Sequence, residues 1–216
     1  MKTRNKIMLL ALCMAALIAV SVLGTMAYLT STDTVTNTFT VGKVAITLDE
    51  RKVNTDGSPV TPDEYVKANS YKLIPGRTNT KDPTVTVLPN SEESYVRMVV
   101  TVTFKKTPDE KINVKDIDDI FRGYNGNAWN QTSTTVSDDR KVVTYVYDYK
   151  EPVSTDATAK KLPALFTSVE IPGEWTQMEL NAIGNFEIKI VAQAIQTDGF
   201  NDSAAAWKSF NGGTGK

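Results

Sequence analysis

The chain has 216 residues with a net charge of −1, a single cysteine and no histidine. Without histidine it cannot use His-based acid–base catalysis, Ser-His-Asp or Cys-His nucleophiles, or HExxH zinc sites. The mildly acidic balance argues against nucleic acid as a partner and offers no basic patch for anionic lipid.

Residues 1–27 have the pattern of a signal peptide: a basic start, an uncharged apolar run over residues 7–23, and small residues before a cleavage site. We expect Thr25, Ala27 and Tyr28 to form the cleavage site. The cut would follow Ala27, so that Tyr28 becomes the N-terminus. One alternative is a retained membrane anchor, since seventeen apolar residues approach the length of a spanning helix. Lipid attachment at Cys13 is a second and weaker one, because Leu12 stands where a small residue is needed.

Cleavage after Ala27 would leave 189 of the 216 residues, enough for one substantial domain. It would remove Lys2, Arg4 and Lys6 and no acidic residue, which takes the net charge from −1 to −4. It would also remove the only cysteine, so the exported protein could form no disulfide. Its stability must then come from a packed core.

Residues 28–48 predict a long strand, or two strands joined at Gly42. Every second residue from 30 to 40 is threonine, so an extended backbone places six threonines on one face. The opposite face carries Leu29, Val35, Phe39 and Val41, with Ser31, Asp33 and Asn37 between them.

The remaining elements are predicted from the periodicity of apolar residues and from turn-forming residues. Residues 51–70 predict a surface loop with a helical turn near Tyr65. Short strands are expected at 71–74, 84–88 and 165–171, a hairpin at 129–136 and 141–149, and long strands at 95–104 and 185–196. Helical spacing predicts short helices at 113–123, 176–182 and 203–210, the first capped by Asn113 and the last by Asp202.

Seven to nine strands with closely spaced turns and no strand–helix alternation predict an all-β fold. We expect a jelly-roll-like antiparallel β-sandwich with short helical insertions. The expected division is a signal peptide (1–27), an N-terminal strand segment (28–48), a β-sandwich domain (49–210) and a flexible tail (211–216).

Carboxylate or metal chemistry has little support in the sequence. Asp116, Asp118 and Asp119 fall in the predicted helix, where a solvated face explains them while Ile117 and Ile120 point inward. The EF-hand calcium-loop pattern is absent, and a turn into a capped helix accounts for residues 198–202. We therefore expect no catalytic residue, no metal site and no cofactor.

Three stretches resemble the TasA/camelysin (CalY) family of exported Gram-positive proteins: AYLTSTDTVTNTFTVGKVAITLDE, KLIPGRTNTKDPTVTV and IVAQAIQTDGFNDSAAAW. The match spans nearly the whole exported chain and is most specific around Asn37, Phe39, Gly42 and Val44. The resemblance implies a signal peptide cut by a dedicated SipW-type signal peptidase. It also implies a jelly-roll subunit of biofilm matrix fibres, in which each N-terminal strand completes the sheet of the next subunit.

The expected donor-strand residues are therefore Leu29, Val35, Asn37, Phe39 and Val41. The expected partners are other copies of the chain, the peptidase and, in one version, a minor anchoring subunit, with membrane contact only through the uncleaved signal peptide. Camelysin members are also described as metallopeptidases, but this sequence has no histidine to hold a zinc ion. The alternatives are a monomeric surface adhesin or anchoring module, binding through the loops at 51–70 and 155–161, and a camelysin-like secreted peptidase.

Overall fold

The computed structural model describes residues 12–14, 42–72, 74–110, 113–173, 175–176, 178, 180–181 and 184–212, and the chain divides into two units between Val41 and Gly42. The expected cleavage site and all five expected donor-strand residues lie outside the described residues. In the described parts, no helix is both long and apolar enough to cross a membrane.

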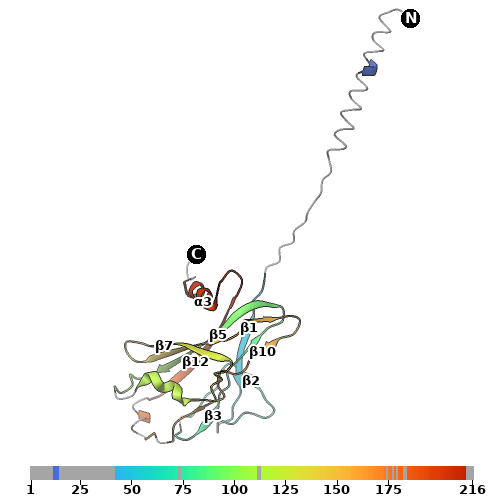
Figure 1. Ribbon diagram of the computed structural model, residues 1–216. Helices are drawn as coiled ribbons and strands as arrows, with labels where there is room; N and C mark the ends of the chain where they lie inside the picture. The colour runs from blue at the N-terminus through green and yellow to red at the C-terminus, as the bar shows by residue number, and fades with distance from the viewer. Residues whose placement is uncertain are drawn as a thin grey trace, which may run out of the picture. The chain divides into compact units, whose positions relative to one another are not determined.

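The unit Gly42–Lys216 is all-β, with antiparallel sheets and few helices (Figure 1). Its described residues form twelve strands: β1 Ile46–Arg51, β2 Tyr65–Val66, β3 Thr78–Thr80, β4 Thr84–Val87, β5 Ser91–Phe104, β6 Phe121–Arg122, β7 Trp129–Val136, β8 Val142–Tyr149, β9 Val153–Thr155, β10 Lys160–Lys161, β11 Ser168–Glu170 and β12 Phe186–Gln196. The helical segments are the 3₁₀ helix η1 Val114–Ile120 and the C-terminal α3 Ser203–Gly212.

The largest sheet has the strand order β12-β5-β8-β7, and β5 is its centre. Alternate residues of β5 face the core, and Val96, Met98, Val100, Val102 and Phe104 are at most 2% exposed. The pairing partners of this face on β8 are Val143, Tyr145 and Tyr147, which are also buried.

The other two sheets close over this core. One has the order β10-β4-β1-β2 and the other β3-β11-β6. Val85 and Val87 of β4 are fully buried, as are Leu165 and Phe166 ahead of β11. All residues of the core cluster lie in the part of the chain that starts at Gly42, so this unit has a hydrophobic core of its own.

Several sequence predictions are confirmed. The strands at 84–88, 95–104 and 185–196 and the hairpin at 129–149 are present as β4, β5, β12 and the pair β7–β8. Asn113 caps η1 through its side-chain oxygen, and Asp202 Oδ1 accepts from the Ala205 N–H at 2.7 Å at the start of α3. Described residues 178, 180 and 181 are helical, within the helix expected at 176–182.

Other predictions are wrong, and in the first of them tertiary pairing overrides the local pattern. The helical turn near Tyr65 is instead strand β2, which pairs with Glu50 and Arg51 of β1. No strand covers described residues 71, 72 and 74, and the strand in that region is β3. The strand at 165–171 shortens to β11, and the expected seven to nine strands become twelve because strands of two or three residues add to the count.

Candidate functional site

Strand β12 forms one edge of the largest sheet. It pairs in register with β5 along its whole length, and among the described residues it has no strand on its other side. The Asn185 carbonyl accepts from the Lys105 N–H, and the Thr197 N–H donates to the Glu93 carbonyl. Odd-numbered residues therefore bond to β5, and the backbone groups of the even-numbered residues point to the free edge.

The core-facing side of β12 is less covered than that of β5. Phe186, Ile188, Ile190, Ala192 and Ala194 are each only partly buried, whereas the residues opposite them on β5 are buried almost completely. Apolar side chains and free backbone groups thus coincide on one edge. Such an edge is a template for pairing with another strand.

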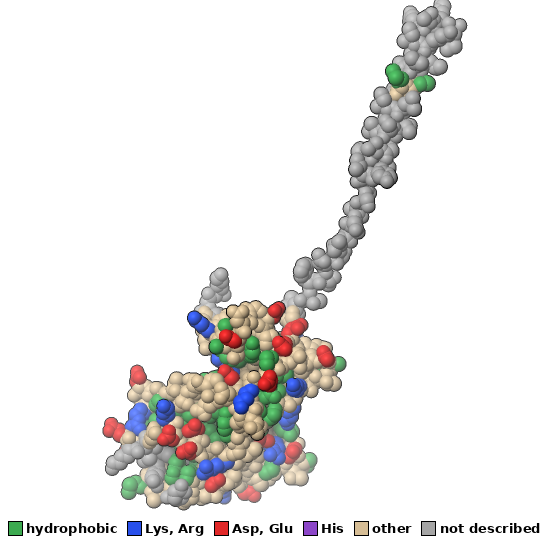
Figure 2. Space-filling view, in the orientation of Figure 1, with side chains coloured by type: hydrophobic (Ala, Val, Ile, Leu, Met, Phe, Trp, Pro, Cys, Tyr) green, Lys and Arg blue, Asp and Glu red, His purple; other side chains and the backbone are tan. Residues whose placement is uncertain are grey.

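A groove of about 1010 Å³ runs beside this edge. Its apolar wall comes from both β12 and β1, and Val169 and Ile171 add to its floor. Figure 2 shows hydrophobic side chains reaching the surface in the middle of the viewed face, between side chains of both charges. The apolar residues that line the groove are Ile46, Leu48, Val66, Ala68, Pro83, Val169, Ile171, Phe186, Ile188, Ile190, Val191 and Ala192.

Strand β1 forms the opposite wall of the groove. The Leu88 N–H donates to the Ala45 carbonyl, so Thr47 and Asp49 exchange bonds with β4 and the backbone groups of Ile46 and Leu48 point away from it. The Lys67 ammonium donates to the Leu48 carbonyl. A lysine side chain therefore occupies an acceptor at this edge, where an added strand would bond.

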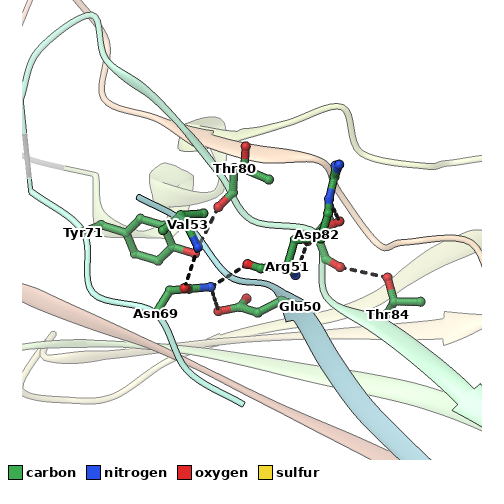
Figure 3. Close-up of polar contacts among 8 residues, drawn as sticks. All are labelled: Glu50, Arg51, Val53, Asn69, Tyr71, Thr80, Asp82 and Thr84. Carbon is green, nitrogen blue, oxygen red and sulfur yellow. Dashed lines mark hydrogen bonds and ion pairs between the residues drawn. The ribbon is translucent and has the colours of Figure 1, made fainter. Parts of the chain in front are cut away.

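One stretch of the groove wall is polar. Lys81 Nζ lies 2.7 Å from Glu50 Oε2, and the two side chains are each 7% exposed. The Asn69 amide donates to Glu50 Oε1 at 3.0 Å and to the Arg51 carbonyl at 2.8 Å, while its oxygen accepts from the Val53 N–H at 3.1 Å (Figure 3). These bonds hold the end of β1 and the Glu50 carboxylate in one place.

Tyr71 also belongs to this polar stretch, and Arg51, next to Glu50 in β1, forms an ion pair with Asp82. The Tyr71 hydroxyl donates to the Thr80 carbonyl at 3.1 Å (Figure 3). The Tyr71 ring lies 5.5 Å from Lys81 Nζ. Burial, reinforced by the Glu50 charge, raises the pKa of Tyr71. Arg51 binds the Asp82 carboxylate through its side chain at 2.7 Å and its backbone N–H at 2.9 Å.

The prediction that the apolar side chains of the acidic helix point inward is confirmed. Ile117 and Ile120 of η1 are 4% and 0% exposed. Asp118 is partly buried, and that burial raises its pKa. Among the described residues, no group of three or more acidic or cysteine side chains is placed to hold a metal ion.

Sequence reasoning missed the groove and its polar stretch. Glu50 and Lys81 are 31 residues apart, and neither stands in a motif, so no local signal pairs them. The unpaired edge of β12 also has no signature, because its alternation matches that of a central strand. The expected donor-strand residues cannot be placed against the groove, because they lie outside the described residues.

The fold and groove define an all-β chain whose largest sheet has an uncovered apolar edge. Comparisons of the chain with protein-family models, with curated proteins and with solved structures found no match.

Proposed function

We propose that the chain is an exported structural subunit of extracellular matrix fibres, and that it polymerises head to tail after its signal peptide is removed. In this proposal, residues 28–41 of one subunit enter the groove beside β12 of the next. The observation that carries the proposal is the free edge of β12 with its half-exposed apolar face.

The dimensions favour an extended segment as the occupant. The groove lining extends from Asn185 to Ala192, and eight residues at about 3.3 Å each correspond to a strand of about 26 Å. The fourteen residues 28–41 span about 46 Å when extended at the same rise, so about eight of them suffice. The remainder can connect to the donor subunit.

The alternation of the segment also fits. Val35, Asn37, Phe39 and Val41 follow one another every second residue on one face, the same period as Phe186, Ile188 and Ile190, and the threonines lie on the other face. Backbone hydrogen bonds to the β12 edge would supply affinity, and the apolar side chains would fill the groove. The incoming strand would complete the sandwich as a jelly roll.

This mode of assembly accounts for the expected processing. A segment attached to an uncleaved signal peptide is held at the membrane, so cleavage by a SipW-type peptidase frees it only after export. A head-to-tail contact does not close on itself and therefore propagates a filament. The partners are other copies of the chain, and the location is the extracellular matrix or cell surface.

The test compares two chains, one starting at Tyr28 and one starting at Gly42. The first should form filaments in electron micrographs. The second should remain a folded monomer, because residues 46–207 contain the buried core. Filaments from the shortened chain, or dispersed particles from the longer one, would refute donor-strand assembly.

A further inference from the structure

The groove contains a buried ion pair in an otherwise apolar wall. Lys81 and Glu50 are in direct contact, and both side chains line the groove. Lys81 Nζ has three N–H donors, one of which goes to Glu50 Oε2. The Glu50 carboxylate accepts from Lys81 and Asn69 and has further lone pairs.

A strand that fills the groove must cover this pair. An apolar side chain placed over it would remove the remaining water without replacing its hydrogen bonds, which is costly for charged groups. A carboxylate would be repelled by Glu50, and an ammonium by Lys81. A side-chain amide suits both, because its oxygen can accept from Lys81 while its NH₂ group donates to Glu50.

We propose, on the basis of the proposed function, that the Lys81–Glu50 pair recognises the side-chain amide of Asn37 from an incoming segment and so fixes the register of the inserted strand. A single buried polar residue is known to set register in this way in other assemblies.

The spacing of the segment fits this assignment. Asn37 lies between Val35 and Phe39 on the apolar face, two residues from each. On the groove wall, Leu48 lies two residues from Glu50 on the same face of β1. An amide over the ion pair therefore brings a large apolar side chain over Leu48. A slip by two residues would instead place Val35 or Phe39 over the charges.

The experiment uses the chain that starts at Gly42, whose core is complete, and synthetic peptides of residues 28–41. The dissociation constant is measured for the natural peptide and for its Asn37→Leu and Asn37→Asp forms. Each peptide is tested on the natural chain and on a Glu50→Gln, Lys81→Met variant. This variant removes both charges but keeps an acceptor for Asn69 and the volume of the lysine stem.

The control variant is Lys52→Met, Glu64→Gln. It removes a second Lys–Glu pair with the same 2.7 Å separation, but one whose side chains are 48% and 53% exposed. Thermal unfolding of both variants verifies that they are folded.

We expect both altered peptides to bind the natural chain and the control variant about ten- to a hundredfold more weakly than the Asn37 peptide. On the Glu50→Gln, Lys81→Met variant, Asn37→Leu should bind at least as well as Asn37. Equal binding of Asn37 and Asn37→Leu to the natural chain would overturn the recognition and leave fibre assembly intact. Unchanged discrimination by the charge-free variant would also overturn it, and binding by no peptide would overturn both proposals.

Discussion

The substitution Ile190→Ala separates the stability of the subunit from the stability of the fibre. Ile190 lies on the free edge opposite Val100, which is fully buried, while Ile190 itself is only partly buried. Truncating a fully buried isoleucine costs about 2 to 5 kcal/mol. Since the groove leaves part of this side chain uncovered, we expect a loss of about 1 to 2 kcal/mol in the free energy of unfolding of the shortened chain.

The rest of the loss should appear only when a donor strand covers the side chain. A further 1 to 2 kcal/mol or so corresponds to a critical concentration for fibre formation roughly five to thirty times higher. Sedimentation of fibres from the chain starting at Tyr28 measures this concentration, and urea unfolding of the chain starting at Gly42 measures the subunit.

A residue of the same strand outside the groove provides the control. Ile195 lies on the opposite face of β12, paired with Tyr95 of β5, and does not line the groove, so Ile195→Ala should change the critical concentration by less than twofold. Equal effects of Ile190→Ala and Ile195→Ala on the critical concentration, or an unchanged critical concentration for Ile190→Ala, would refute the assignment of this face to the donor strand.

Three further predictions follow from individual contacts. Lys67→Met removes the ammonium from the Leu48 carbonyl, so the chain starting at Tyr28 should polymerise faster; slower growth in light scattering would contradict a protective role for Lys67. Arg97→Met removes hydrogen bonds to Gln193 and Asn211, each 2.7 Å long, and the stacking on Trp207. It should lower the free energy of unfolding by about 2 to 4 kcal/mol and speed amide exchange in α3, and unchanged exchange would contradict this docking. Burial raises the pKa of Asp118, so its ionised carboxylate destabilises the folded chain. This loss of stability grows as the pH rises from about 3.9, the ordinary pKa of an aspartate, to the raised pKa, and it stays constant at higher pH. Asp118→Asn should therefore stabilise the chain more at pH 7 than at pH 3. Urea unfolding at both pH values measures this difference, and a larger stabilisation at pH 3 would contradict it.

The strands that could be predicted from the sequence are those whose own residues alternate over many positions. The side chains of β5, β8 and β12 repeat with a period of two, and each strand is present where the pattern places it. Strands β2 and β10 have two residues each, and pairing with β1 and β4 defines them. A strand of two residues is too short for any hydrophobic periodicity to predict it.

The site was harder to predict than the fold, because it depends on what is missing beside a strand. Phe186 and Phe104 have the same alternation in the sequence, yet Phe104 is 2% exposed and Phe186 is only partly buried. Periodicity reports which face of a strand is apolar, but not whether another element covers it. The Lys81–Glu50 pair likewise arises from contacts between distant segments.

An uncovered apolar edge is a hazard for the free chain, since any strand can add to it. Three features of this chain limit that hazard in the free subunit. Glu187 and Lys189 are exposed along β12, Lys67 occupies an acceptor on β1, and a buried ion pair interrupts the apolar wall. Charges on an edge and polar groups in a groove disfavour unselected apolar strands more than a strand with a matching amide. The same features that protect the subunit would therefore select its partner.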